Sequence, residues 1–395
     1  SVIDTDTASV AEHIRLPNGS HSLRDIAISP DGKSALIPHV LSNYMPPPLS
    51  PEGGAVNMNM ISLVDTETLE WTHAVPVDDP DRGAANPWAI AFARGGSLLL
   101  VTHAGTHELS VIDFPALRCR LASMPRPFPQ DRPDFRLLDG IRRRLALGVN
   151  GPRDLAVAGD IALAAGYFSG ELAVLDLAPD TLRPRLLRVG ETAIPSLARL
   201  GEAYFNDATL GVGGWQSCAS CHPDGRSDTL YWDLMNDGAG NTKNTKSLLM
   251  SALASPVMWR GVREDAATAV RSGFHHILGS QGLPPRTEHA ILAYLREMPE
   301  VPSPFLDADR PDAPQTEDSS CAKCHRPTVP RGSLTEAARR GKALFEGKAG
   351  CVTCHPHPLF TTARDADPGL GSGVPYRIPS LIETWRTAPY LHAGD

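Results

Sequence analysis

Three copies of one short motif, Cys-x-x-Cys-His, constrain this chain more than any other feature of its sequence. They lie at Cys218–His222, Cys321–His325 and Cys351–His355. In this motif each cysteine forms a thioether bond to haem, and the histidine binds the iron from the proximal side. A zinc site would instead need two such pairs around one centre. The sequence therefore predicts three covalent haem c groups, attached through Cys218, Cys221, Cys321, Cys324, Cys351 and Cys354, with His222, His325 and His355 as proximal iron ligands.

Composition narrows the class of partner and the compartment. The formal net charge of −8 over 395 residues argues against nucleic acid or an anionic membrane surface. We find no apolar run of about 18 residues, the length that a membrane-spanning helix needs. Haem attachment takes place outside the reducing cytosol, so we expect an exported, periplasmic protein whose signal peptide is not in this sequence. Of the seven cysteines only Cys119 lies outside the motifs, and we expect it to be a structural or edge-strand thiol.

The first half of the chain is built from repeats. The segments SVIDTDT, SLVDTET, SVIDFPA and AVLDLAP begin at Ser1, Ser62, Ser110 and Ala173. Each is a short β-branched strand that ends in Asp and a turn, and further apolar strands lie between the copies, as in a β-propeller blade. The unit resembles the YVTN family of bacterial propeller repeats. A propeller closes with four or more blades, and Ser1 begins inside a blade, so we expect a partial, truncated propeller.

After Pro195 the pattern becomes helical. Arg199–Phe205 leads into the first motif, Thr287 is expected to cap a helix that ends at Pro299, and Ser333 with Glu336 forms a predicted capping box for a helix running towards Cys351. The fold class predicted is multidomain: an all-β propeller followed by mainly α cytochrome c-type haem domains. The predicted divisions are propeller blades at 1–192, a first cytochrome c domain at 193–299, a Pro-rich linker with the extra haem at 300–332, and a second, C-terminally incomplete cytochrome c domain at 333–395.

The region from about Arg199 to Asp395 resembles the bacterial di-haem cytochrome c peroxidase and MauG-like family. The matching segments, in the order that the family has them, are Cys218–His222, Asn241–Leu249, Trp259–Gly261, Arg340–Phe345, Cys351–His355, Ile378–Leu381 and Ala388–His392. The resemblance implies that the haem on His222 reacts with peroxide and that the haem on His355 transfers electrons. It also implies that His392 is an inter-haem or ligating residue. Trp232 is our candidate for the tryptophan that lies between the two haems in this family.

The chain departs from this family in three ways. The motif at Cys321–His325 adds a third haem inside what should be a linker. The distal Glu that assists O–O cleavage by acid–base chemistry is missing from its expected place, and Glu264 and Asp265 are nearby but out of register. The sequence stops just after His392, before the family's usual ligand for the last haem, so the sequence assigns no sixth ligand there.

The sixth iron ligand decides the chemistry of each haem. A second His or a Met closes the iron for electron transfer, whereas an open position allows peroxide or oxygen to bind. The candidates are His392, His275, His276, His357, His39, His103, Met258, Met250 and Met235. His39 and His103 occupy equivalent positions near the ends of two blades, where they would face the haem domains across an interface.

Two functions remain open from the sequence. In the first, the protein is a periplasmic tri-haem oxidoreductase of the peroxidase/MauG type that uses hydrogen peroxide or a high-valent iron. The propeller is then a docking platform for a redox partner protein or a protein substrate. In the second, it is a non-enzymatic tri-haem electron carrier with all irons six-coordinate. A catalytic propeller is a weaker third hypothesis, because the blades contain no convincing cluster of His and carboxylates.

Overall fold

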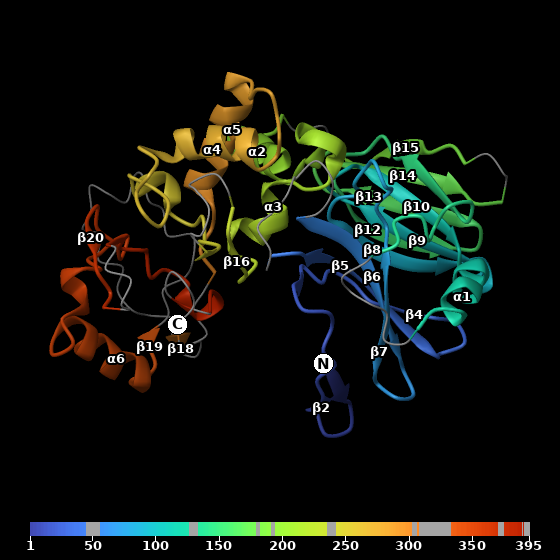
Figure 1. Ribbon diagram of the computed structural model, residues 1–395, viewed down its shortest axis with the longest axis horizontal. Helices are drawn as coiled ribbons and strands as arrows, with labels where there is room; N and C mark the ends of the chain where they lie inside the picture. Colours follow the sequence, from blue (N-terminus) through green and yellow to red (C-terminus); the bar gives the residue numbers. More distant parts are fainter. Residues whose placement is uncertain are drawn as a thin grey trace.

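A computed structural model describes residues 1–44, 56–125, 133–178, 182–190, 194–234, 242–301, 306–307, 333–369, 375–388 and 390. The N-terminal half consists of antiparallel sheets and the C-terminal half of helices joined by short strands (Figure 1). The predicted fold class, an all-β propeller region followed by mainly α haem domains, is confirmed. The Cys-x-x-Cys-His motif at Cys321–His325 and His392 lie outside the described residues, so the motifs at Cys218–His222 and Cys351–His355 are called the first and second motifs below.

Three sheets form the blades of the propeller region. The first contains β3 (Ser20–His21), β4 (Ala27–Ile28), β5 (Ser34–Ser42), β6 (Asn57–Asp65) and β7 (Trp71–Pro76). The second contains β8 (Pro87–Ala93), β9 (Leu98–His103), β10 (Glu108–Asp113) and β11 (Arg142–Ala146). The third contains β12 (Pro152–Ala158), β13 (Ile161–Gly166), β14 (Glu171–Asp176) and β15 (Arg185–Arg188). Consecutive antiparallel strands of this kind are the topology of a propeller blade. A separate hairpin pairs β1 (Val2–Asp4) with β2 (Ser9–Glu12).

The repeated Asp at the end of each unit has a local structural role. The Oδ1 atom of Asp65 accepts hydrogen bonds from the backbone N–H groups of Glu67 and Thr68, at 2.9 and 3.0 Å. Asp4 does the same for Asp6 and Thr7, both at 2.9 Å. Such Asx turns reverse the chain after a strand, which explains why the repeat keeps this residue.

Residues that alternate along the strands form the core between blades. On β9, Leu99 packs in one apolar cluster with Leu36 and Ile61, whereas its neighbour Leu100 packs in another with Leu109. Successive side chains of a strand point to opposite faces of the sheet. The middle blade is therefore buried on both faces, and this packing holds the three sheets together.

The third repeat unit leads into a helix rather than a strand, and this corrects our expectation for Cys119. Helix α1 (Phe114–Ala122) begins after Asp113, whose carboxylate accepts a hydrogen bond of 2.9 Å from the N–H of Ala116. Pro115 lies in the first turn, where a missing N–H costs nothing. Cys119 is exposed on this helix.

The C-terminal half contains α2 (Leu197–Asn206), α3 (Cys218–Cys221), α4 (Ala266–His276), α5 (Pro285–Glu297) and α6 (Glu336–Glu346). Its short strand pairs are β16 (Tyr231–Trp232) with β17 (Lys243–Asn244), β18 (Leu306–Asp307) with β19 (Ser333–Leu334), and β20 (Asp365–Ala366) with β21 (Tyr376–Arg377). The 3-10 helices are η2 (Arg94–Gly96) in the propeller, then η3 (Ala208–Leu210), η4 (Val212–Gly214), η5 (Pro223–Gly225), η7 (Ser251–Leu253), η8 (Cys351–Thr353) and η9 (Thr384–Arg386).

Two predicted helix caps differ from those observed. Helix α5 begins at Pro285 after Pro284, so Thr287 lies inside the helix instead of capping it. Helix α6 is capped by Thr335, whose hydroxyl accepts a hydrogen bond of 3.2 Å from the N–H of Ala338. Ser333 belongs to β19. In both cases a neighbouring residue is equally suited to begin the helix. Pro is favourable in the first turn, as in α5, and Thr is a favourable N-cap, as in α6.

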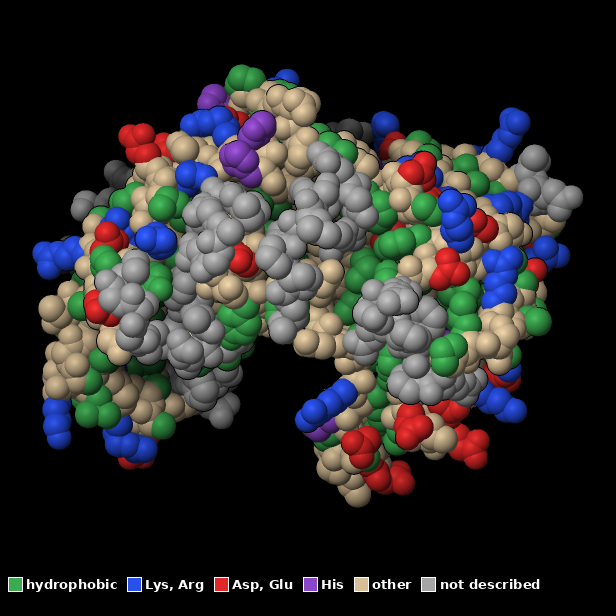
Figure 2. Space-filling view, viewed as in Figure 1, with side chains coloured by type: hydrophobic (Ala, Val, Ile, Leu, Met, Phe, Trp, Pro, Cys, Tyr) green, Lys and Arg blue, Asp and Glu red, His purple; other side chains and the backbone are tan. Residues whose placement is uncertain are grey.

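The two halves meet where α2 and α3 lie beside the propeller (Figure 1). In Figure 2 a gap is visible between the surfaces of the two halves, below the point where they meet. Among the described residues, none of the helices combines the length and the apolar character required to cross a membrane.

Candidate functional site: two haem attachment motifs on one cavity

Helices α2 and α5 form the scaffold behind the first motif. They cross so closely that a Cβ atom placed on Gly201 would lie 1.8 Å from the carbonyl oxygen of Ala290. Only glycine permits this approach. Phe205, Ile291 and Leu295 fill the apolar core between these helices and the motif, so the haem-binding segment rests on a rigid support.

The first motif forms the single turn of α3. Ser217 and Ser220 make a reciprocal capping box at its N-terminus, and His222 follows Cys221 directly. The Nδ1 atom of His222 lies 3.1 Å from the carbonyl oxygen of Arg226. Because a carbonyl only accepts, Nδ1 carries the proton, and Nε2 is left as the metal-binding nitrogen. Proximal histidines in metal sites have this second hydrogen bond, so the geometry fits a haem iron.

The second motif repeats this arrangement. Cys351 begins η8, and the Nδ1 atom of His355 lies 2.9 Å from the carbonyl oxygen of Phe360. The ring of Phe360 packs edge to face on that of Phe345 from α6, with centroids 6.1 Å apart. The two motifs, although far apart in sequence, therefore fix the same tautomer of the histidine that follows the second cysteine.

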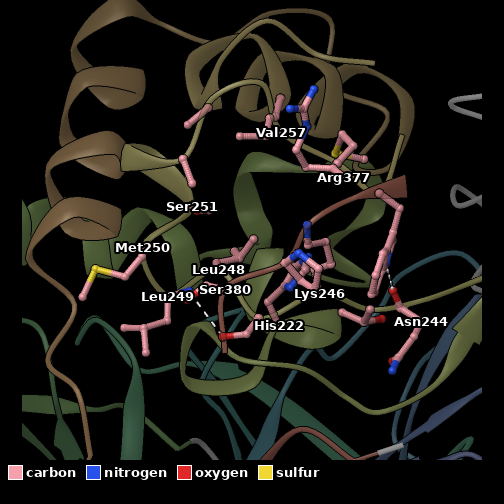
Figure 3. A pocket seen from close by; sticks show the side chains of 18 of the residues that line it. His222, Asn244, Lys246, Leu248, Leu249, Met250, Ser251, Val257, Arg377 and Ser380 are labelled. Carbon is pink, nitrogen blue, oxygen red and sulfur yellow. Dashed lines mark hydrogen bonds between the residues drawn. The ribbon is translucent and has the colours of Figure 1, made fainter. Parts of the chain in front are cut away.

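Both motifs open onto one cavity of about 790 Å³. Its wall includes Cys218, His222 and Trp232 from the first haem-binding segment and Cys354 and His355 from the second. Cofactor sites commonly measure about 300–1,000 Å³ and are mainly apolar. Figure 3 shows His222 within this wall, near Leu248, Leu249 and Met250. The cavity fits a large flat apolar group attached at either motif.

The charges of the cavity wall are unbalanced. Lys243, Lys246, Arg263 and Arg377 line it, and none of the described lining residues is an Asp or Glu. Burial, together with the nearby charge of Arg377, lowers the pKa of Lys246 to about 8. The guanidinium of Arg377 pairs with Asp365 through Nε at 3.2 Å, and its Nη1 atom is buried without a hydrogen-bond partner. A haem has two propionates, and this set of cations is suited to bind them.

Two interactions after the first motif organise the cavity. Asp228 accepts a hydrogen bond of 2.9 Å from the indole N–H of Trp232, whose side chain is buried. Burial raises the pKa of Asp228 to about 6, while hydrogen bonds from Leu230, Thr245 and Trp232 oppose that shift. Trp232 thus lies in the cavity wall, as its predicted role requires. Whether it lies between two bound haems stays a prediction.

Arg226 forms a buried ion pair with Glu383, a residue that sequence reasoning did not select. The guanidinium donates hydrogen bonds of 3.0 and 2.7 Å to the two carboxylate oxygens. The side chains are only 9% and 2% exposed. Because Arg226 follows the first motif and Glu383 follows the second, this pair ties the two haem-binding segments together. No local pattern marks Glu383 in the sequence, since its partner is 157 residues away.

The structure places the sixth-ligand candidates very differently. Met258 and Met250 line the cavity, whereas His275, His276 and His357 are exposed and do not; histidines on the outer surface of the helical half are visible in Figure 2. His39 and His103 lie inside their blades, where their Nε2 atoms are each 2.8 Å from a serine hydroxyl, of Ser62 and Ser110. The two histidines are fully buried and are not brought to the haem site. His392 and Met235 lie outside the described residues.

The two carboxylates near the expected distal position do not line the cavity either. Glu264 is exposed, and Asp265 caps α4 by accepting a hydrogen bond of 2.8 Å from the N–H of Thr268. In the described part of the wall, the histidines are thus the side chains that can act as bases. The remaining charged side chains are Lys and Arg, and none is an Asp or Glu.

The fold and the paired motifs define a c-type haem protein. Residues 195–313 match the family model described as di-haem cytochrome c peroxidase, so this region of the chain is similar to that family. The predicted resemblance is thereby confirmed.

Among curated relatives, hydrazine synthase subunit gamma from Kuenenia stuttgartiensis is 32% identical over 44% of this chain and 48% of its own length. Cytochrome-c peroxidase IdrP1 from Pseudomonas sp. (strain SCT) is 28% identical over 49% of this chain and 67% of its own. A solved structure of Kuenenia stuttgartiensis hydrazine synthase is 26% identical, covers 45% of this chain and 51% of that one, and has a TM-score of 0.41. The chain thus spans about half the length of the first of these relatives.

Proposed function

We propose that the protein is a haem oxidoreductase of the di-haem peroxidase/MauG type, with the reactive haem on His222 and an electron-transfer haem on His355. The observation that carries this proposal is the single cavity lined by both attachment motifs. Two haems in one cavity exchange electrons rapidly, so a reaction at one iron is supplied through the other. The relatives are named for two chemistries, peroxide reduction and hydrazine synthesis. The proposal therefore fixes the reaction class, with hydrogen peroxide as the first substrate to test.

The residues of the chain have separable roles in this proposal. Bound haem supplies the redox-active iron. His222 and His355 hold the iron through Nε2, because their Nδ1 protons are engaged by backbone carbonyls. Lys246 and Arg377 bind propionates, and Leu248, Leu249 and Val257 exclude water from the reacting centre. Trp232, held by Asp228 in the cavity wall, is our candidate for passing electrons between the two haems.

Three further parts of the proposal extend beyond this cavity. We propose a third haem on Cys321, Cys324 and His325, and export to the periplasm, where such haems are attached. We also propose that a redox partner protein or a protein substrate docks on the propeller. Counting covalent haems by intact-protein mass spectrometry tests the third site, because each haem adds one fixed mass.

The second candidate is a pure electron carrier with every iron six-coordinate. It is favoured by the lack of any carboxylate among the described lining residues, since peroxide cleavage depends on a group that moves a proton at the distal side. Met258 and Met250, which line the cavity, are available to close an iron.

EPR spectroscopy of the ferric protein, repeated after one electron equivalent per molecule, separates these functions. The oxidoreductase is expected to show a high-spin signal in one of the two states, and to react with hydrogen peroxide in stopped-flow absorbance after half-reduction. A variant with Cys351→Ala and Cys354→Ala lacks the second haem and should lose any effect of half-reduction. Purely low-spin signals in both states, with no peroxide reaction, would establish the carrier instead.

A further inference from the structure

Three asparagines of the propeller contact the segment that carries the first haem motif. Asn86 lies just before β8 and faces both serines of the capping box around Cys218. Its amide nitrogen donates to the hydroxyl of Ser217, and its carbonyl oxygen accepts from that of Ser220, each at 2.9 Å. Asn86 has a left-handed backbone with φ of 56°, a conformation that asparagine tolerates better than most residues. The side chain thus bridges the N-cap residue and the third residue of the single turn of α3.

A second asparagine reaches the cysteine itself. The amide nitrogen of Asn57, on β6, lies 2.7 Å from Oε1 of Gln216 and 3.5 Å from Sγ of Cys221. Its other end belongs to a buried chain within the first blade: Ser42 donates to Asn57, and His21 lies 2.8 Å from the Ser42 hydroxyl. Asn57 is 1% exposed. A hydrogen bond from the propeller therefore ends on a haem-attachment sulfur.

The backbone of the same segment is held as tightly. Asn59 donates a hydrogen bond of 3.2 Å to the carbonyl oxygen of Trp215 and one of 2.8 Å to the buried carboxylate of Asp78. Gly83 donates its N–H to the carbonyl of Gly213 at 2.8 Å. A Cβ atom on Gly83 would lie 2.3 Å from the Cα of Trp215, so the two backbones are in direct contact.

We propose that the propeller is a structural part of the first haem site, with Asn57 and Asn86 as positioning residues for the haem on His222. The inference rests on the proposed function only for the presence of that haem. Buried amides that each bind a partner across the junction fix one arrangement of the two halves, because any shift leaves polar groups unpaired in the interior. The orientation of Cys218, Cys221 and His222 is therefore set by the blades. Reduction potential and spin state follow such outer hydrogen bonds and solvent access.

The test compares Asn86→Ala and Asn57→Ala with Asn150→Ala in the full-length haem protein. Asn150 is a partly buried propeller residue whose described contacts stay within the third blade. Two readouts are used: the EPR signal and midpoint potential of the His222 haem, and hydrogen exchange of the peptide around residues 215–225. Loss of two buried hydrogen bonds of about 1 kcal/mol each predicts exchange that is faster by about tenfold or more. The His355 haem is the internal reference.

A double-mutant cycle shows whether Asn86 acts through the capping box. If it does, Asn86→Ala combined with Ser217→Ala and Ser220→Ala changes the His222 haem signal no more than the serine substitutions alone. The proposal predicts a shifted or split signal for the His222 haem in the Asn86 and Asn57 variants, with an unchanged His355 haem and unchanged Asn150→Ala protein.

Two results would overturn the proposal. One is an unaltered His222 haem and unaltered exchange in both variants. The other is an equal disturbance of both haems or of the Asn150→Ala control, which would indicate general unfolding of the propeller. Because these readouts do not involve peroxide, the outcome is independent of whether the protein turns peroxide over.

Discussion

The propeller and the haem-binding half differ in where their buried charged and polar groups lie. In the propeller, buried polar side chains pair with one another: His39 with Ser62, His103 with Ser110, and Asn59 with Asp78. In the haem-binding half, Arg226 is paired with Glu383 and Arg377 with Asp365, but Lys246 lines a large cavity whose described wall contains no carboxylate. Since unpaired buried charge is costly, the propeller is a finished scaffold, whereas the cavity is shaped for an anionic group that the chain does not itself provide.

The largest effect should come from the attachment cysteines. Cys218→Ala with Cys221→Ala removes both thioether bonds of the first motif, so the covalent haem content should fall by one haem per chain in mass spectrometry and in a pyridine haemochrome assay. The exposed Cys119 provides the matched control, since Cys119→Ala should leave the count unchanged. An unchanged count in the double variant would contradict the assignment of this motif.

The next largest effect concerns the ion pair between the two haem-binding segments. Glu383→Gln leaves the buried guanidinium of Arg226 without its counter-charge, and breaking such a pair costs about 3–5 kcal/mol. Denaturant unfolding followed by haem absorbance should show this loss. The control is Glu346→Gln, because Glu346 pairs with Lys342 on the surface of α6, where both side chains are 40% exposed or more. Such pairs contribute about 0–1 kcal/mol. Equal losses in the two variants would mean that Glu383 does not join the segments.

Asp228 should give a smaller effect that depends on pH. Burial raises its pKa from 3.8 to about 6, so the folded protein binds this proton more tightly than the unfolded chain. The stabilisation is present below the unfolded pKa and is lost as the pH rises through 6. The raised pKa corresponds to at most about 3 kcal/mol.

Asp228→Asn removes this titration while keeping the shape of the side chain. Thermal unfolding of the haem protein should therefore show a flatter dependence on pH between 4 and 8 for Asp228→Asn than for the unaltered protein. Asp154→Asn is the control, because Asp154 is exposed on β12 and should leave the pH dependence as it is. An unchanged pH profile in Asp228→Asn would show that this carboxyl does not titrate with a raised pKa.

The contrast between the two halves also explains what the sequence could predict. Strand repeats and Cys-x-x-Cys-His spacing are local patterns, and they predicted the blades and both described haem motifs. The expectation of a structural or edge-strand thiol at Cys119 missed the helix there, which begins where the Asp113 carboxylate accepts from the N–H of Ala116. Glu383, Asn57 and Asn86 act through contacts with residues more than 130 positions away. No periodicity or spacing in one sequence reveals such pairs.

The smallest effect on the haems is expected for the two blade histidines, which the sequence offered as sixth ligands. His39→Ala and His103→Ala each remove a buried hydrogen bond to serine and should lower the free energy of unfolding by about 1–3 kcal/mol. Because neither histidine reaches the cavity, the EPR and absorbance spectra of the haems should stay unchanged. Met258→Ala is the informative contrast, since Met258 lines the cavity and its loss should alter the spectrum if its sulfur closes an iron. Loss of a low-spin signal in His39→Ala or His103→Ala would instead show that these histidines bind a haem iron. That result would contradict the contrast between a finished propeller scaffold and a cavity shaped for a cofactor.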